Sequence, residues 1–294
     1  MRKNYIVVTG GAGFIGSNLI KYLINKTTFD IISLDNYSTG SKKNEINNKR
    51  IKYIKSETKS IFKNLNLYKK KIHSVFHFGE FSRIYQSFSN MSACIDSNTI
   101  GSNEVFNFCL LNKIKLIYSA TSASIGNKGN DKNLSPYAFT KAKNLELLEN
   151  LKKWFNFRFE IIYFYNVYGP SQIQDGSMAT VIGIFEKQFR KKIPLSVVKP
   201  GSQSRRFTHV FDTIETCFYA WKKNKCFHYS ISHRQSYTIL EVAKMFGGKI
   251  AFLPPRKGER YASALTSINL SNKVHKIFGK IKLKDYIKNI VKNS

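Results

Sequence analysis

Cysteine and long apolar runs are scarce in this sequence. Only four of its 294 residues are cysteine, and their spacing gives neither a close metal-binding pair nor the density of a disulfide scaffold. No apolar run approaches the ~18 residues of a membrane span, and the first apolar stretch is too short for a signal-peptide core. We therefore expect a cytoplasmic protein with reduced thiols, no metal site and no membrane segment.

Acidic side chains are also few. The chain has 48 Lys and Arg against 18 Asp and Glu, a formal net charge of +30. Such an excess can serve nucleic-acid binding, since phosphate contacts favour Lys and Arg. The lysines, however, are scattered along the whole chain, and Lys, Asn and Ile are abundant together, as AT-rich codons would make them. We therefore expect a preference for anionic substrates rather than nucleic-acid binding.

Apolar residues alternate between strand-like and helical patterns. Strand-like runs occupy 5–8, 31–34, 74–78 and 116–118, and helical spacing occurs in 19–24, 103–111 and 137–151. This alternation predicts an α/β fold, a Rossmann-type doubly wound parallel sheet with helices on both faces. After Tyr163 the pattern loosens, and pairs such as Gly169-Pro170 and Pro254-Pro255 separate shorter elements. These predict a smaller C-terminal α/β lobe at the carboxyl ends of the strands, where ligands of such sheets bind.

A glycine-rich turn follows the first strand. Gly10, Gly13 and Gly16 stand at the spacing that lets backbone N–H groups approach a pyrophosphate at a helix N-terminus. Asp35 ends the next strand, 19 positions after Gly16, where a carboxylate binds the ribose hydroxyls of NAD and repels the 2′-phosphate of NADP. Read alone, Asp35 could be an ordinary turn residue. In this context we predict NAD binding.

A phenol and an ammonium group share one helix face at Tyr137 and Lys141. Ser135-Pro136 supplies an N-cap and a first helical proline, so Tyr137 falls in the first turn. A tyrosine of pKa ~10 is a poor base at neutral pH, but a nearby ammonium group and an oxidised nicotinamide stabilise the phenolate. Taken alone, this spacing also fits a solvated helix face; after a nucleotide turn it predicts a catalytic pair.

Hydroxyl side chains end the strand that precedes this helix. Thr121, Ser122 and Ser124 follow the apolar run 116–118. We expect one of these hydroxyls to share the substrate oxygen with Tyr137, although small hydroxyl residues at a strand end can also be plain loop caps.

With these elements in place, the chain resembles the extended short-chain dehydrogenase/reductase family, and within it the UDP-glucose 4-epimerase branch. The resemblance extends nearly from end to end. Its motifs are the glycine turn, Leu34-Asp35-Asn36-Tyr37-Ser38-Thr39-Gly40, His77-Phe78-Gly79, Asn98-x-x-Gly101, Tyr137-x-x-x-Lys141, Phe164-Tyr165-Asn166-Val167-Tyr168-Gly169-Pro170, Arg205-Arg206-Phe207-Thr208-His209 and Arg256-Lys257-Gly258-Glu259.

The resemblance assigns roles to residues. It implies Thr121, Tyr137 and Lys141 as the catalytic set, with NAD as cofactor. The cofactor-binding residues it implies are Gly10, Gly13, Phe14, Ile15, Gly16, Asp35, Asn36, Ser38, Thr39, Gly40, Glu57, Thr58, Phe78, Gly79, Ser82, Asn98, Tyr137, Lys141 and Tyr165. The substrate-binding residues it implies are Thr121, Asn166, Arg205, Arg256, Glu259 and Ser263.

The activity implied is 4-epimerisation of a UDP-hexose by transient oxidation. Tyr137 takes the proton of the sugar 4-hydroxyl, C4 gives a hydride to NAD, and the hydride returns to the opposite face. The small Ser263 at a gatekeeper position implies room for an N-acetyl group. The resemblance also implies a homodimer, formed through the helices that begin near Ser92 and Tyr137. Residues 1–165 with about 206–232 would bind NAD, and 166–205 with 233–294 the nucleotide sugar.

Several residues depart from the family pattern. Arg206 replaces the usual aspartate after Arg205, and Glu80 stands where small residues are common. We expect Glu80 to pair with Arg83, or else to touch the sugar as an additional acid. Ser122-Ala123 follow Thr121 where related dehydratases and decarboxylases carry acids. Nucleotide-sugar reduction, epimerisation at another carbon and a non-catalytic dinucleotide sensor remain as alternatives.

Overall fold

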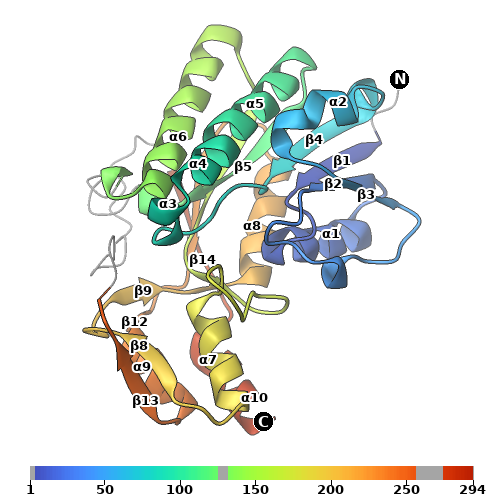
Figure 1. The fold of residues 1–294 in the computed structure, drawn as a ribbon. Helices are drawn as coiled ribbons and strands as arrows, with labels where there is room; N and C mark the ends of the chain where they lie inside the picture. The colour runs from blue at the N-terminus through green and yellow to red at the C-terminus, as the bar shows by residue number, and fades with distance from the viewer. Residues whose placement is uncertain (1–3, 125–131, 256–273, 294) are drawn as a thin grey trace.

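An eight-stranded sheet runs through the larger part of the molecule (Figure 1). The computed structural model describes residues 4–124, 132–255 and 274–293. In spatial order the strands are β14 (Val274–Phe278), β11 (His228–Ser232), β6 (Phe159–Phe164), β5 (Lys115–Thr121), β4 (Ile72–His77), β1 (Tyr5–Thr9), β2 (Asp30–Asp35) and β3 (Ile51–Lys55). Every neighbouring pair is parallel. The prediction of a doubly wound parallel sheet is therefore confirmed.

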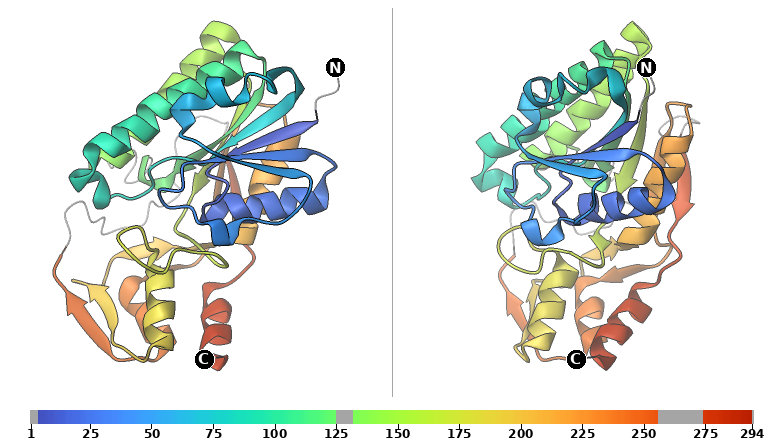
Figure 2. Two further views of the ribbon diagram at one scale, coloured as in Figure 1. Left: turned by 45° about the vertical axis from the view of Figure 1, so that its right-hand side comes forward. Right: turned by 90° about the vertical axis from the view of Figure 1, so that its right-hand side faces the viewer.

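Helices cover both faces of this sheet (Figure 2). Helices α1 (Phe14–Lys26) and α8 (Val210–Lys222) pack together on one face, and α2 (Ile61–Leu65), α5 (Ser102–Leu111) and α6 (Pro136–Phe155) lie on the other. Successive side chains of β1 alternate between the two hydrophobic clusters: Ile6 and Val8 belong to one and Val7 to the other. A strand buried on both sides explains why residues 5–8 are apolar without interruption.

A smaller group of elements lies below the carboxyl ends of the strands in Figure 1. Its members are α7 (Val181–Arg190), β8 (Leu195–Val198), β9 (Ser204–Arg206), β12 (Ser236–Thr238), α9 (Ile239–Phe246), β13 (Ile250–Leu253) and α10 (Leu283–Lys292). Strands β8 and β13 are parallel, β9 and β12 antiparallel, and the group has its own hydrophobic cluster. Strand β14 joins the large sheet beside β11, so the chain returns there before α10. The domain boundaries given above stay a prediction.

Helix α6, which carries Tyr137 and Lys141, is fixed at both ends. The Ser135 hydroxyl accepts a hydrogen bond from the Ala138 N–H at 3.1 Å, and Pro136 is the first helical residue, as predicted. At the other end Asn156 adopts a left-handed conformation with φ of 53° and caps the last turn. Across residues 4–124, 132–255 and 274–293, no helix is both long and apolar enough to cross a membrane.

Replacing Ser135 by Ala should lower the free energy of unfolding by about 1 kcal/mol, because the N–H of Ala138 loses its cap. Urea denaturation of the two proteins measures this difference. Ser135→Thr keeps the hydroxyl and is the matched control; equal stability of all three proteins would contradict the capping role.

Candidate active site

A cleft of about 1130 Å³ lies at the carboxyl ends of β1, β2, β4 and β5. The order of the sheet reverses between β1 and β4, so the loops that follow these strands diverge and leave a crevice. Residues implied by the sequence that line it are Gly10, Gly13, Phe14, Ile15, Gly16, Asp35, Asn36, Ser38, Thr39, Glu57, Thr58, Phe78, Gly79, Ser82, Thr121, Tyr137, Lys141, Asn166 and Arg205. The cleft thus brings the nucleotide turn and the reacting groups to one wall.

The glycine turn is packed too tightly for side chains. A Cβ at Gly16 would lie 2.1 Å from the carbonyl oxygen of Gly10, and one at Gly10 would lie 2.8 Å from the N of Gly79. Gly10 also has φ of 70°, which favours glycine. Helix α1 begins directly after this turn, so its amino end forms part of the cleft wall. Such a cradle fits a pyrophosphate.

Asp35 lies beside this turn with both carboxylate oxygens engaged. Oδ2 accepts a hydrogen bond from the Ala12 N–H at 2.9 Å, and Oδ1 accepts one from the Tyr37 N–H at 2.7 Å. Burial raises the pKa of Asp35, and these backbone hydrogen bonds oppose that rise. A Cβ at Gly40 would lie 2.8 Å from Oδ1, so Gly40 sits behind the carboxylate rather than on the wall. Asp35 keeps acceptor capacity toward the cleft, as ribose hydroxyls require.

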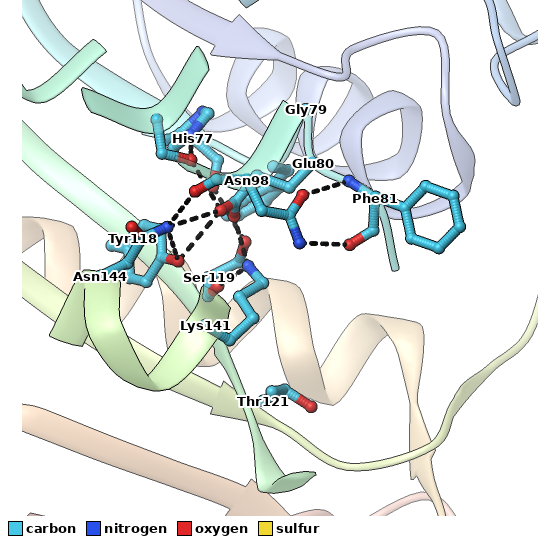
Figure 3. Close-up of polar contacts among 12 residues, drawn as sticks. His77, Gly79, Glu80, Phe81, Asn98, Tyr118, Ser119, Thr121, Lys141 and Asn144 are labelled. Atoms are coloured by element: carbon cyan, nitrogen blue, oxygen red, sulfur yellow. Dashed lines mark hydrogen bonds and ion pairs between the residues drawn. The ribbon is translucent and has the colours of Figure 1, made fainter. Parts of the chain in front are cut away.

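The three residues implied as catalytic all line the cleft. Thr121 ends β5, while Tyr137 and Lys141 lie in the first two turns of α6. The Lys141 ammonium group donates to the Ser119 carbonyl at 2.5 Å and lies 4.7 Å from the centre of the Tyr118 ring (Figure 3). Burial lowers the pKa of Lys141, and the charge of Glu80 opposes this. Tyr137 is 8% exposed, so it is shielded yet reachable from the cleft.

The prediction that Glu80 pairs with Arg83 is wrong. Glu80 forms an ion pair with Lys141, 61 positions away in sequence. Its carboxylate also accepts hydrogen bonds from Ser102, Tyr118 and Asn144 (Figure 3). Arg83 contacts a different segment, because its Nε donates to the Met178 carbonyl at 3.0 Å. A partner so distant along the chain leaves no local signal in the sequence.

His77, at the end of β4, connects the nucleotide turn to this cluster. One ring nitrogen lies 2.7 Å from the Thr9 hydroxyl and the other 2.9 Å from that of Ser102. Complete burial lowers the pKa of His77 to about 4, so the imidazole is neutral at pH 7.

Asn98 braces the same region from behind the wall. It lies in the π-helical segment η4 (Asp96–Gly101), and its side-chain oxygen accepts from the Phe81 N–H at 2.7 Å. Its amide nitrogen donates to the Phe81 carbonyl at 3.0 Å and to the Thr140 hydroxyl at 3.3 Å, which joins the loop after β4 to α6. Tyr165 is fully buried in the hydrophobic cluster under α5 and α6 and is not among the residues that line the cleft.

The far side of the cleft is formed by the segment before α7. Arg83 and Gln86 reach across and donate to the backbone carbonyls of Met178 and Ser177. Asn166, with φ of 38°, donates to the Arg206 carbonyl at 2.9 Å, and Arg205 is 9% exposed on the wall. The remaining substrate residues implied by the sequence, Arg256, Glu259 and Ser263, lie outside the described residues.

Stability should fall as the pH drops from about 6.5 to about 4, partly because of His77. His77 binds a proton near pH 6.5 in the unfolded chain but only near pH 4 in the folded protein. The free energy of unfolding therefore decreases by about 3 kcal/mol across this range. Urea unfolding of wild type and His77→Gln across this range measures it as the difference between the two pH slopes. Parallel slopes would contradict a neutral, buried His77.

Comparison with known proteins adds to this geometry. A model of the NAD dependent epimerase/dehydratase family matches residues 6–232. The ADP-L-glycero-D-manno-heptose-6-epimerase of Brachyspira hyodysenteriae is 29% identical over an alignment of 258 residues, which covers 81% of this chain and 79% of that protein. A putative UDP-glucose 4-epimerase of Methanocaldococcus jannaschii is 28% identical over an alignment of 274 residues, which covers 87% of this chain and 88% of that protein.

Solved structures share the fold along nearly the whole chain. The UDP-glucose 4-epimerase of Thermotoga maritima with UDP-glucose has a TM-score of 0.87 at 22% identity, covering 98% of this chain and 97% of that chain. The Thermus thermophilus UDP-glucose 4-epimerase complex with NAD has a TM-score of 0.83 at 21% identity, and the match covers 98% of each chain. A dTDP-glucose 4,6-dehydratase of Streptomyces venezuelae has a TM-score of 0.85 at 18% identity, and the match covers 98% of this chain and 96% of that chain. Because the family model spans most of the chain, this protein belongs to the NAD-dependent epimerase/dehydratase family.

Proposed function

We propose that this protein is an NAD-dependent nucleotide-sugar 4-epimerase of the UDP-glucose/UDP-galactose type. The observation that supports the proposal is that Thr121, Tyr137 and Lys141 line the same cleft as the glycine turn and Asp35. Bound NAD supplies a hydride acceptor that can return the hydride. The chain's own residues must then bind the sugar nucleotide, move the hydroxyl proton and exclude water.

Tyr137 is the proton acceptor in this proposal. Its phenolate oxygen takes the proton of the sugar 4-hydroxyl and gives it back after the keto sugar has turned. Thr121, on the neighbouring strand end, donates a hydrogen bond to the same sugar oxygen. Lys141 stabilises the phenolate from the next turn of α6. The low exposure of Tyr137 keeps bulk water from the oxygen that carries the proton.

Asn166 and Arg205 are the proposed diphosphate ligands on the opposite wall. A homodimer acting in the cytoplasm completes the proposal. Large apolar side chains are exposed on the helices expected at the dimer interface, namely Met91 and Ile95 on α4 (Met91–Ile95) and Phe139 on α6. An N-acetylhexosamine is a further candidate substrate because of the small Ser263.

Epimerisation at another carbon is the second candidate. It is favoured by the 29% identity to an enzyme named as a heptose-6-epimerase. A panel of UDP-, ADP-, GDP- and dTDP-sugars, incubated without added NAD and followed by proton NMR, separates the two. We expect interconversion of 4-epimers of a UDP-sugar; an exclusive change at another carbon would overturn the 4-epimerase assignment.

Replacing Tyr137 by Phe should reduce turnover about 100-fold or more, because the proton acceptor is lost. The NAD that co-purifies with the protein should remain. Tyr219→Phe, on α8 and outside the cleft, is the matched control and should match wild type. Undiminished turnover by Tyr137→Phe would refute the proposed mechanism.

Gly16→Ala should abolish NAD retention, since its methyl group would collide with the Gly10 carbonyl in the proposed pyrophosphate cradle. Acid release of nucleotide from the purified protein, read at 260 nm, measures it. Gly248→Ala serves as control, because a Cβ there has its nearest neighbour at an ordinary 3.5 Å. If Gly16→Ala retained as much NAD as wild type, the proposed pyrophosphate site at this turn would be wrong.

A further inference from the structure

An ion pair is buried at the floor of the cleft. The side chains of Glu80 and Lys141 are 1% and 4% exposed, and they are in direct contact. Both also line the cleft, so the pair is buried and yet belongs to the site that holds the reacting groups. A buried charge pair of this kind is rarely a net source of stability, because desolvation offsets the attraction. Its position therefore points to a role in chemistry.

Glu80 is held rigidly as a carboxylate. Its Oε1 accepts hydrogen bonds from the hydroxyl of Ser102 at 2.8 Å, the phenol of Tyr118 at 3.0 Å and the amide of Asn144 at 3.3 Å. These donors come from α5, β5 and α6, so three separate elements fix one oxygen while the other contacts Lys141. Full satisfaction by donors is what a buried carboxylate needs to stay ionised.

Lys141 is fixed in turn. Its ammonium group has three hydrogens, and Glu80 and the Ser119 carbonyl accept two of them. The ammonium group also lies 4.7 Å from the centre of the Tyr118 ring. Burial lowers the pKa of Lys141, and the charge and hydrogen bond of Glu80 oppose this shift.

We propose that Glu80 is a positioning residue for the proposed epimerase: it fixes the Lys141 side chain on the helix that carries Tyr137 and partly cancels the positive charge that the phenol experiences. This inference rests on the proposed function. A lysine beside a carboxylate acts on its surroundings as a dipole rather than a full charge. The Tyr137 phenolate is therefore stabilised less than it would be by an unpaired lysine, and the acid–base midpoint of Tyr137 lies at higher pH.

Other ionisable groups face the pair from each neighbouring element. His77 on β4 is neutral, since burial lowers its pKa to about 4, and burial raises the pKa of both Cys94 on α4 and Tyr118 on β5. Arg83, on the loop after β4, stays cationic although burial lowers its pKa. Of the pair and these neighbours, all in the part of the chain that the structure describes, the groups charged near neutral pH are therefore Glu80, Lys141 and Arg83, and the charge of Arg83 acts on Tyr137.

The test is a titration of Tyr137 by NMR in protein labelled with ¹³Cζ-tyrosine. The resonance that disappears in Tyr137→Phe identifies this residue. In Glu80→Gln, which keeps the shape but removes the charge, the midpoint of Tyr137 should fall by about one pH unit, because removing a negative charge favours the phenolate. An unchanged midpoint would overturn the proposal.

Glu160→Gln is the matched control. Glu160 and Lys115 form a second buried ion pair at 3.4 Å, with side chains 0% and 8% exposed, on β6 and β5 away from the cleft. Its loss should lower stability and leave the Tyr137 midpoint in place. Equal shifts in both glutamate variants would show a general effect of destabilisation and would refute the specific role of Glu80.

Should Glu80→Gln fail to fold, Lys141→Gln and Glu80→Gln/Lys141→Gln replace it. The double variant buries no unpaired charge. Its Tyr137 midpoint should lie about one pH unit below that of Lys141→Gln, because only the Glu80 charge differs between the two. Identical midpoints would refute the inference. The titration needs no substrate, so it is independent of the sugar panel. If no sugar of the panel reacted but the Tyr137 midpoint shifted, the proposed epimerase activity would be refuted and the charge effect of Glu80 retained.

Discussion

The hydroxyl of Thr9 joins the strand end that carries the glycine turn to the loop that follows β4. It stands at the end of β1, accepts hydrogen bonds from the N–H groups of Phe78 and Gly79 at 3.1 and 3.0 Å, and contacts His77. Gly10 follows at once and touches Gly79 so closely that neither can carry a side chain. The glycine turn and the loop after β4 are therefore one rigid unit, built at the point where the strand order reverses.

From that junction a buried polar chain continues to the lysine. His77 contacts Ser102, Ser102 donates to Glu80, and Glu80 contacts Lys141. A network in which each member is satisfied is rigid, and rigidity is what a hydride and proton transfer between bound partners requires. The lysine charge is also partly neutralised within this chain. In the described part of the chain, the other cationic side chains that line the cleft are that of Lys59, which pairs with Glu57 and Asp96, and those of Arg83 and Arg205, which can attract an anionic substrate.

The sequence predicted well what short segments determine by themselves. The apolar runs of β1 and β2, the glycine turn and the start of α6 at Ser135-Pro136 each depend on neighbours within a few residues. It failed for Glu80, because the choice between Arg83 and Lys141 depends on how β4, α5 and α6 pack. The motif Phe164-Tyr165-Asn166 marked the correct place, yet its tyrosine lies in the core and Phe164 lines the cleft.

The side chains of Arg83 and Gln86 donate hydrogen bonds to the main-chain oxygens of residues 178 and 177. Every amino acid offers that same oxygen, so the identity of these two residues is irrelevant to the attachment. Mutation can therefore change the side chains of this part of the cleft lining while the segment stays anchored in one position. Such a scaffold allows related enzymes to diverge in the sugars they accept without rebuilding the wall that encloses them.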